Sequence, residues 1–198
     1  MTTFVALALA WVQIACLNVE TATPEPSDAD PMTAEVTEKH LVLTLDDLDR
    51  QGLVIDRNEV TIRLVRNASP LGGIYMVVYL AHKLDGDLVL QSQTVAVEEG
   101  VQRPAVRLAG FARNYTPGFE QTLTEGYGVR RHNSVEIEDI PAPGEMCELY
   151  RKDELWGFRF VGRSDRHIYY LAMANMPQLD LTRFGALVRE HILSVEQG

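Results

Sequence analysis

The sequence contains few of the residue patterns that mark a catalytic or metal-binding protein. None of its five histidines lies at zinc-ligand spacing from another, and the chain has only two cysteines. The glycine pair in "SPLGGIY" (69–75) is followed neither by Lys-Ser/Thr nor by a helix pattern, which excludes a phosphate-binding loop. No nucleophile elbow or oxyanion motif surrounds Cys147. We therefore predict no catalytic residue, no metal site and no cofactor.

Positive charge is also scarce. The chain has 18 Lys and Arg residues against 28 Asp and Glu, a formal net charge of −10. Binding to nucleic acid needs clustered Lys and Arg, so the sequence predicts no nucleic-acid partner. Residues 1–38 have no Lys or Arg at all, and "ETATPEPSDADPMTAEVTE" (20–38) is acidic and rich in Pro, Thr and Ala. Because such a segment buries little apolar surface, we expect an acidic tether over 17–38 and a single domain over 39–198.

No apolar run is long enough to span a bilayer as a helix. The longest, "FVALALAWVQIAC" (4–16) with Leu17, is shorter than the about 20 residues that a span needs and has the length of a signal-peptide apolar region. It ends in "QIAC", which resembles the lipobox of bacterial lipoproteins, with the small Ala15 just before Cys16. The resemblance implies lipidation of Cys16 after cleavage. The alternatives are export or anchoring without lipidation, and a helix of the core.

The two cysteines leave the disulfide question open. A Cys16–Cys147 bond could form if the N-terminus is retained, although nothing in the sequence favours it. If Cys16 is acylated or removed, Cys147 has no partner, and we expect a small buried apolar residue there.

The pattern from residue 39 onward predicts an α+β fold with an antiparallel sheet of about six strands. Alternating or apolar runs indicate strands, and Asp85-Gly86 indicates a hairpin between two of them. The predicted strands cover 40–45, 59–67, 72–83, 85–99, 134–140, 146–151, 157–162 and 167–174. Trp156, Phe158 and Phe160 are expected to share one core-facing side, with an aromatic contact surface as the alternative.

Helices are predicted mainly at the C-terminus. "LDLTRFGALVREHILSV" (179–195) places apolar residues on one helical stripe after a candidate N-cap at Asp180, and His191 is expected at the boundary of that stripe. The middle, 101–133, could hold a short helix, but Pro104, Gly110, Pro117 and Gly126 interrupt it.

One acidic stretch partly matches a calcium-binding loop. "DLDRQGLVIDRN" (47–58) has Asp47, Asp49 and Gln51 at the first three ligand positions, but Asn58 replaces the bidentate Glu. A capped helical turn that ends at Gly52 is the favoured interpretation.

The candidate partner-binding residues are Arg130, Arg131, His132 and Trp156. The first three form the most basic patch of the chain, "RRHN", and could bind an anion or the carboxylates of a partner. A solvated loop is the simpler interpretation of that patch.

The C-terminal pattern carries a family resemblance. A Tyr-bearing strand, "HIYYLAMANM", followed by "LTRFGALVREHILSV" resembles the close of PsbP-like domains, including small bacterial lipoproteins of that fold. The resemblance implies a non-enzymatic, membrane-anchored protein of the bacterial cell envelope, facing the periplasm and binding a partner protein or stabilising an assembly. The alternative is an exported enzyme or small-ligand-binding protein with a site built from scattered residues.

Overall fold

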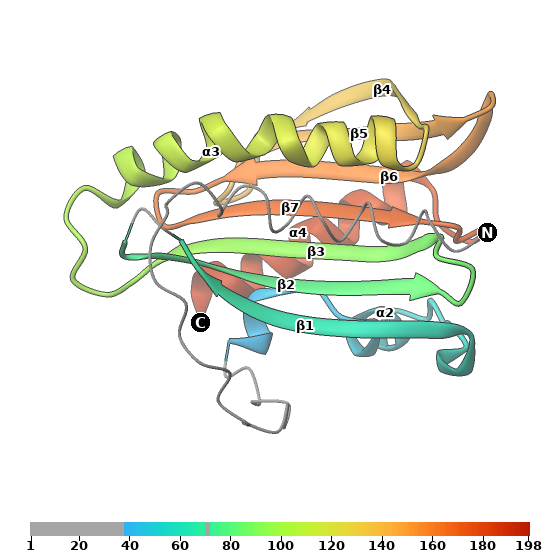
Figure 1. The fold of residues 1–198 in the computed structure, drawn as a ribbon, viewed down its shortest axis with the longest axis horizontal. Coiled ribbons are helices and arrows are strands. Elements are labelled where there is room, and N and C mark those ends of the chain that lie inside the picture. Colours follow the sequence, from blue (N-terminus) through green and yellow to red (C-terminus); the bar gives the residue numbers. More distant parts are fainter. Residues whose placement is uncertain (1–37, 70–71) are drawn as a thin grey trace, which may run out of the picture.

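The computed structural model describes residues 38–69 and 72–198, which form one seven-stranded antiparallel sheet with helices on both faces (Figure 1). The strands are β1 (Val60–Ala68), β2 (Ile74–Lys83), β3 (Leu88–Val97), β4 (Arg130–Ile137), β5 (Gly144–Arg151), β6 (Glu154–Arg163) and β7 (His167–Ala174). Their order is β1-β2-β3-β7-β6-β5-β4, so two meanders meet where β3 pairs with β7. The predicted α+β class is confirmed. The predictions for residues 1–37, Cys16 included, lie outside the described residues.

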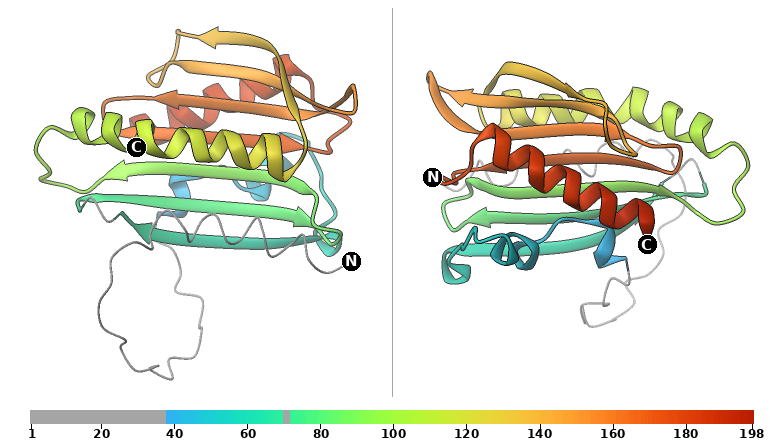
Figure 2. Two further views of the ribbon diagram at one scale, coloured as in Figure 1. Left: turned by 45° about the horizontal axis from the view of Figure 1, so that its top comes forward. Right: turned by 180° about the vertical axis from the view of Figure 1, so that it is seen from behind.

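The helices divide between the two faces of the sheet (Figure 2). One face carries α3 (Pro104–Gln121) and the π-helical turn η3 (Thr122–Gly126), which take the chain from β3 to the far edge at β4. The other face carries α4 (Leu181–Gln197), α2 (Leu45–Arg50) and the 3-10 turn η1 (Lys39–Leu41), while η2 (Arg57–Glu59) leads into β1. Each face has its own apolar cluster, so the central strands are buried on both sides. None of the helices in the described ranges is long and apolar enough to cross a membrane.

The C-terminal helix α4 is confirmed, together with its cap. The Asp180 side chain accepts a hydrogen bond from the Arg183 N–H at 2.7 Å. The apolar stripe packs on the sheet, where Phe184 stacks on Phe158 with ring centroids 5.5 Å apart. The prediction that His191 lies at the boundary of the apolar stripe is wrong, because this residue is buried and only 6% exposed.

The middle of the chain is more helical than the sequence predicts. Pro104 occupies the first residue of α3, where its missing N–H needs no partner, and the 18-residue helix accommodates Pro117 near its end. Two side chains of α3 itself, Leu108 and Phe119, are buried. Tertiary packing against the sheet therefore outweighs the local helix-breaking signals.

The strand predicted at 40–45 is wrong. This segment forms η1 and the start of α2, and its extended part is bonded to side chains of β3. The Leu43 N–H donates to Ser92 Oγ at 2.8 Å, and the Thr94 hydroxyl donates to the Leu41 carbonyl at 2.5 Å. The apolar residues are buried as expected, but the backbone partners are hydroxyl groups instead of a neighbouring strand.

The capped turn at 44–52 is confirmed. Thr44 and Asp47 form a capping box at the start of α2, and Gly52 closes the turn with a φ of +73° that favours glycine. The carboxylates of Asp46 and Asp49 bind Arg57, at 2.5 and 2.8 Å. The acidic stretch is thus neutralised by an arginine of the same chain.

A β-bulge overturns the predicted alternation at Trp156. Leu149 pairs with Gly157 whereas Tyr150 pairs with Leu155, so Trp156 is an extra residue on β6. Trp156 packs in the cluster under α3, while Phe158 and Phe160 pack under α4. All three are buried, but they do not share one side of the strand.

Candidate functional site

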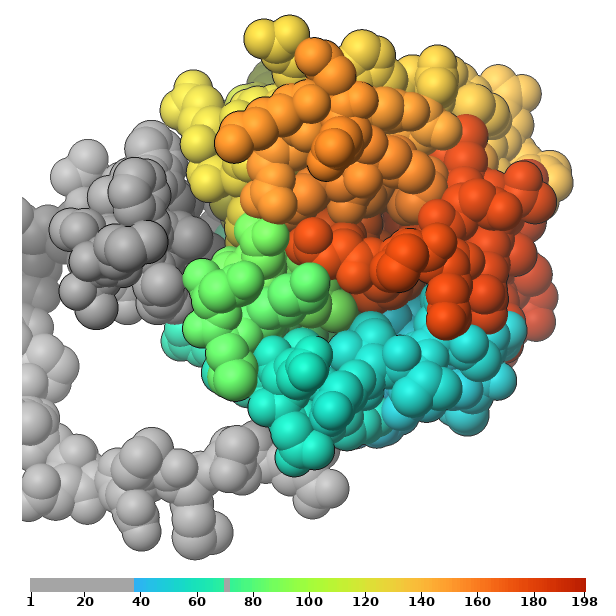
Figure 3. All heavy atoms as spheres, turned by 90° about the vertical axis from the view of Figure 1, so that its right-hand side faces the viewer, coloured from blue at the N-terminus to red at the C-terminus, as the bar shows by residue number. Residues whose placement is uncertain are grey.

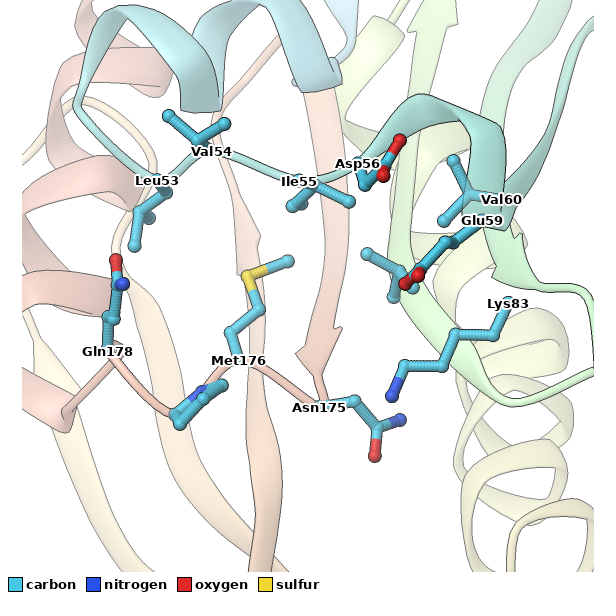
Figure 4. Close-up of a pocket in the computed structure, with 12 residues that line it drawn as sticks. Leu53, Val54, Ile55, Asp56, Glu59, Val60, Lys83, Asn175, Met176 and Gln178 are labelled. Carbon is cyan, nitrogen blue, oxygen red and sulfur yellow. The ribbon is translucent and has the colours of Figure 1, made fainter.

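A hollow of about 260 Å³ lies at one end of the sheet, where three segments of the chain, 53–60, 83–89 and 175–178, come together (Figure 4). We call it the strand-end hollow. Its walls are the connection from α2 to β1 and the connection from β7 to α4, and its floor is formed by β2 and β3. Its lining residues are Leu53, Val54, Ile55, Asp56, Glu59, Val60, Lys83, Val89, Asn175, Met176, Pro177 and Gln178.

Some of the polar groups of the hollow are already engaged. The Asp56 carboxylate caps η2 by accepting from the Asn58 N–H at 2.9 Å. The Asn175 amide donates to the Leu88 carbonyl at 2.7 Å and holds a residue with a φ of +58° in place. Lys83 forms no ion pair with another described residue, and its amine points toward Asn175 (Figure 4). The hollow therefore combines an apolar wall with one available amine.

Two of the most exposed large apolar side chains flank the hollow. Val54 is 80% exposed and lines it, and Leu84 is 71% exposed and follows Lys83 directly. The Leu84 N–H donates to the Glu59 carbonyl at 3.1 Å, which continues the pairing of β1 and β2 beyond Lys83. Figure 3 looks onto this end of the molecule. An exposed apolar rim around a partly apolar hollow is typical of a surface that another molecule covers.

An aromatic and ionic cluster adjoins the hollow through the backbone of Trp156. The Asn175 N–H donates to the Trp156 carbonyl at 3.0 Å. The Trp156 ring is 5.2 Å from that of Tyr127 and 5.6 Å from the Arg151 guanidinium. Arg151 in turn holds Asp87 with two hydrogen bonds of 2.9 Å, and these hydrogen bonds lower the pKa of Asp87. These contacts fix the β2–β3 turn to the β5–β6 turn.

The predicted basic patch lies on the edge strand β4. Arg130 and His132 are exposed, and the His132 ring lies 4.9 Å from that of Tyr150. Arg131 points to the other side of the strand, where it pairs with Glu145. Trp156 is 5% exposed and packs with Tyr127 and Arg151. The structure therefore places Arg130 and His132 on one side of β4 and Arg131 on the other, with Trp156 buried.

A buried charge network lies between α3 and the sheet. The Arg159 side chain, 4% exposed, bonds Glu120 of α3 and lies 3.7 Å from Glu145 of β5. Arg131 completes an alternating set of two guanidinium groups and two carboxylates. Burial raises the pKa of the adjacent Cys147 thiol, a free cysteine that is fully buried as expected. Charges paired in this way make the contact between α3 and the sheet sensitive to the loss of any one partner, and burial favours the protonated thiol.

A second polar cluster joins β7 to the last turn of α4. Glu196 accepts hydrogen bonds from the Tyr169 hydroxyl at 2.6 Å and from His167 at 3.0 Å. Although burial acts to raise it, bonds from His167, Tyr169 and Ser164 hold the pKa of Glu196 at about 2. No set of three or more metal-ligating side chains occurs within 38–69 and 72–198.

Sequence reasoning did not find the strand-end hollow. Its residues come from three segments, 53–60, 83–89 and 175–178, that are brought together only by the order of the strands. The available signal was local: a glycine turn, a hairpin turn and a Pro-containing connection, all of which mark loops where binding residues concentrate. No protein-family model, curated protein or solved structure matches the chain.

Proposed function

We propose that this protein is a non-enzymatic, membrane-tethered lipoprotein of the bacterial cell envelope that binds a partner protein through the strand-end hollow. The observation that carries the proposal is the exposure of two large apolar side chains at a hollow with an apolar wall: Val54, which lines it, and Leu84, which follows the lining residue Lys83. Protein interfaces have an apolar centre surrounded by polar groups. Here Leu53, Val54 and Met176 would form the centre, and Lys83 would lie among the polar groups at its margin.

The rigidity of the rim supports this use. The rim is fixed by the Asn175 bond to Leu88, the Leu84 bond to Glu59 and the Arg151–Asp87 pair. A preformed surface loses little conformational entropy when a partner binds. The partner should present an apolar side chain to the hollow and a carboxylate or carbonyl oxygen to the Lys83 amine.

The membrane tether is the second part of the proposal and depends on the sequence of residues 1–38. A lipobox-like "QIAC" followed by an acidic, Pro-containing segment is the arrangement expected of a lipidated domain held away from the membrane. The membrane contact would be made by the lipid on Cys16.

Site-specific photo-crosslinking in cells tests the binding surface. A photoreactive residue at Val54 should give a crosslinked partner that is lost when Leu84→Ser is added. The matched control is the same residue at Val106, which is 67% exposed on α3 and far from the hollow in sequence. Equal crosslinking from positions 54 and 106 would contradict the assigned surface.

Fractionation tests the anchor. The mature chain should partition into detergent with an acylated N-terminal peptide, and Cys16→Ser should move it to the soluble fraction. An intact, unmodified Met1 in the membrane fraction would show that the anchor is not a lipid on Cys16.

One observation favours a second candidate, the binding of a small ligand. Lys83, Glu59 and Asn175 converge on the hollow, but its volume is just below the range of about 300–1,000 Å³ that is usual for ligand pockets. A small acid that raises the melting temperature of the wild type and not of Lys83→Ala would support this candidate. Val54→Ser would leave that shift unchanged.

A further inference from the structure

The two edge strands of the sheet differ in how well their free edges could pair with another strand. β4 is interrupted by a bulge between His132 and Val135, where Asn133 has a φ of +48°. Such a bulge hinders the pairing of an edge strand with a strand of another molecule. β1, by contrast, pairs with β2 in one unbroken register from Val60↔Lys83 to Ala68↔Tyr75 and is rich in β-branched residues. Thr61, Ile62 and Arg63 are all exposed. β1 is therefore the edge best suited to strand addition.

The hydrogen bonds at the two ends of β1 show which residues face outward. Leu84 N–H donates to the Glu59 carbonyl, and Ser69 N–H donates to the Ile74 carbonyl. Residues opposite each other on antiparallel strands alternate between hydrogen-bonded and non-hydrogen-bonded pairs. The odd-numbered residues of β1 therefore bond β2. The even-numbered ones, Val60, Ile62, Leu64, Arg66 and Ala68, direct their N–H and C=O groups away from the sheet.

We propose that β1 pairs antiparallel with β1 of a second copy of this chain, about a two-fold axis through Leu64. In this register Val60 faces Ala68 of the second copy, and all five outward residues find a hydrogen-bonding partner. The sheet then continues across both copies. This inference does not depend on the proposed function, although the first residue of β1, Val60, also lines the strand-end hollow.

Charge selects this register over its neighbours. With the axis at Leu64, Arg63 faces Val65 of the second copy and Arg66 faces Ile62. Moving the axis by one residue to Arg63, or by two to Arg66, places an arginine directly opposite its own copy, which is destabilising. An axis at Ile62 or Val65 avoids that repulsion but leaves part of the strand unpaired. Self-pairing at Leu64 thus uses the whole of β1 without placing like charges directly opposite each other.

Amide hydrogen exchange of the wild-type protein is the direct test. The outward amides of Ile62, Leu64 and Arg66 should become protected as the protein concentration rises. The inward amides of Thr61, Arg63 and Val65 should be protected at every concentration. Outward amides that exchange equally fast throughout the concentration series would overturn the proposal.

A matched pair of substitutions at Val65 tests the register. Arg63 forms no ion pair with another described residue, so it is available to the second copy. Val65→Glu should strengthen dimerisation and Val65→Lys should weaken it, each by about tenfold because the contact occurs twice. Analytical ultracentrifugation measures both, and circular dichroism confirms that each variant is folded.

The same exchange at Val135 is the control on the other edge. Val135 lies on β4 and is 43% exposed, so Val135→Glu and Val135→Lys should leave the dimerisation constant unchanged. A wild-type protein that stays monomeric at all concentrations sinks the proposal. So does a dimer whose affinity responds at Val135 and not at Val65.

Discussion

At the scale of single residues, the buried polar side chains of this protein differ in how completely they are paired. Arg159 has a carboxylate on either side, yet its Nε and Nη1 atoms have no hydrogen-bond partner. His191 is buried and its Nε2 atom also has none. A buried group that is only partly satisfied makes stability sensitive to substitution and to pH.

Removing Arg159 should be strongly destabilising. Arg159→Met leaves the Glu120 and Glu145 carboxylates without their buried cation, and we expect a loss of about 3 kcal/mol in the free energy of unfolding. Adding Glu120→Gln to that variant should recover part of the loss, because Arg131 then has one carboxylate to neutralise instead of two. Urea denaturation measures all three proteins. Additive effects of the two substitutions would show that the residues do not act as a pair.

His191 should make the protein less stable in acid. Burial lowers the pKa of His191 to about 4 from its ordinary 6.5, although Asp47 and the Leu41 backbone act to raise it. Between pH 6.5 and 4, His191 therefore binds a proton in the unfolded chain but not in the folded chain. The resulting stability is fully present above pH 6.5 and declines as pH falls toward 4, by about 3 kcal/mol.

The non-titrating variant His191→Gln isolates that contribution. Its free energy of unfolding should change less than that of the wild type between pH 6.5 and 4. Below pH 4 the free energies of unfolding of the two proteins should change in parallel with pH. Glu196, whose pKa is about 2 in the folded state, titrates in both. Parallel curves between pH 6.5 and 4 would mean that His191 accepts a proton without cost.

At the scale of elements, the segment that precedes β1 is held to the sheet by side-chain hydroxyls. Ser92→Ala removes the hydroxyl acceptor of the buried Leu43 N–H, so we expect a loss of about 1–3 kcal/mol. The amide of Leu43 should also exchange faster. Ser134→Ala, on the exposed strand β4, is the matched control and should change stability by less than about 0.5 kcal/mol. Similar losses in the two variants would rule out this attachment.

The elements that the sequence predicts well are those whose signals are local. Asp180 and the apolar stripe define α4 without reference to the rest of the chain, and the hairpin at Asp85-Gly86 follows from its turn residues. The segment 40–45 was mistaken for a strand because its burial is visible in the sequence and its bonds to Ser92 and Thr94 are not. The bulge at Trp156 likewise depends on pairing with β5, which no local pattern reveals.

The candidate site was less predictable than the fold for the same reason. Lys83, Val54 and Met176 are unremarkable in their local sequence, and only the strand order β1-β2-β3-β7 brings them to one hollow. Arg159 has no local signal in the sequence that marks it as one half of a buried ion pair. Its partner Glu120 is 39 residues away on a helix that the sequence barely indicates.

At the scale of the whole molecule, the described domain and the acidic segment before it should behave independently. Glu38 is the first described residue, and its carboxylate bonds Arg66 of β1 at 3.1 Å. That contact joins Glu38 to the domain, one residue before its expected start at Lys39. Between Cys16 and Glu38 the composition is that of a charged spacer with few large apolar side chains to bury.

Deleting residues 20–37 should therefore leave the melting temperature of the soluble domain unchanged, because no core contact is lost. Extending the deletion through Glu38 removes its bond to Arg66, and an exposed pair of this kind contributes about 0–1 kcal/mol, so a shift of at most a few degrees is expected. Differential scanning calorimetry of the two deletions and the full chain separates these cases. If the shorter deletion already lowers the melting temperature by more than a few degrees, the acidic segment packs on the domain and is more than a spacer. A binding surface at the strand-end hollow would then have to be mapped again in the presence of that segment.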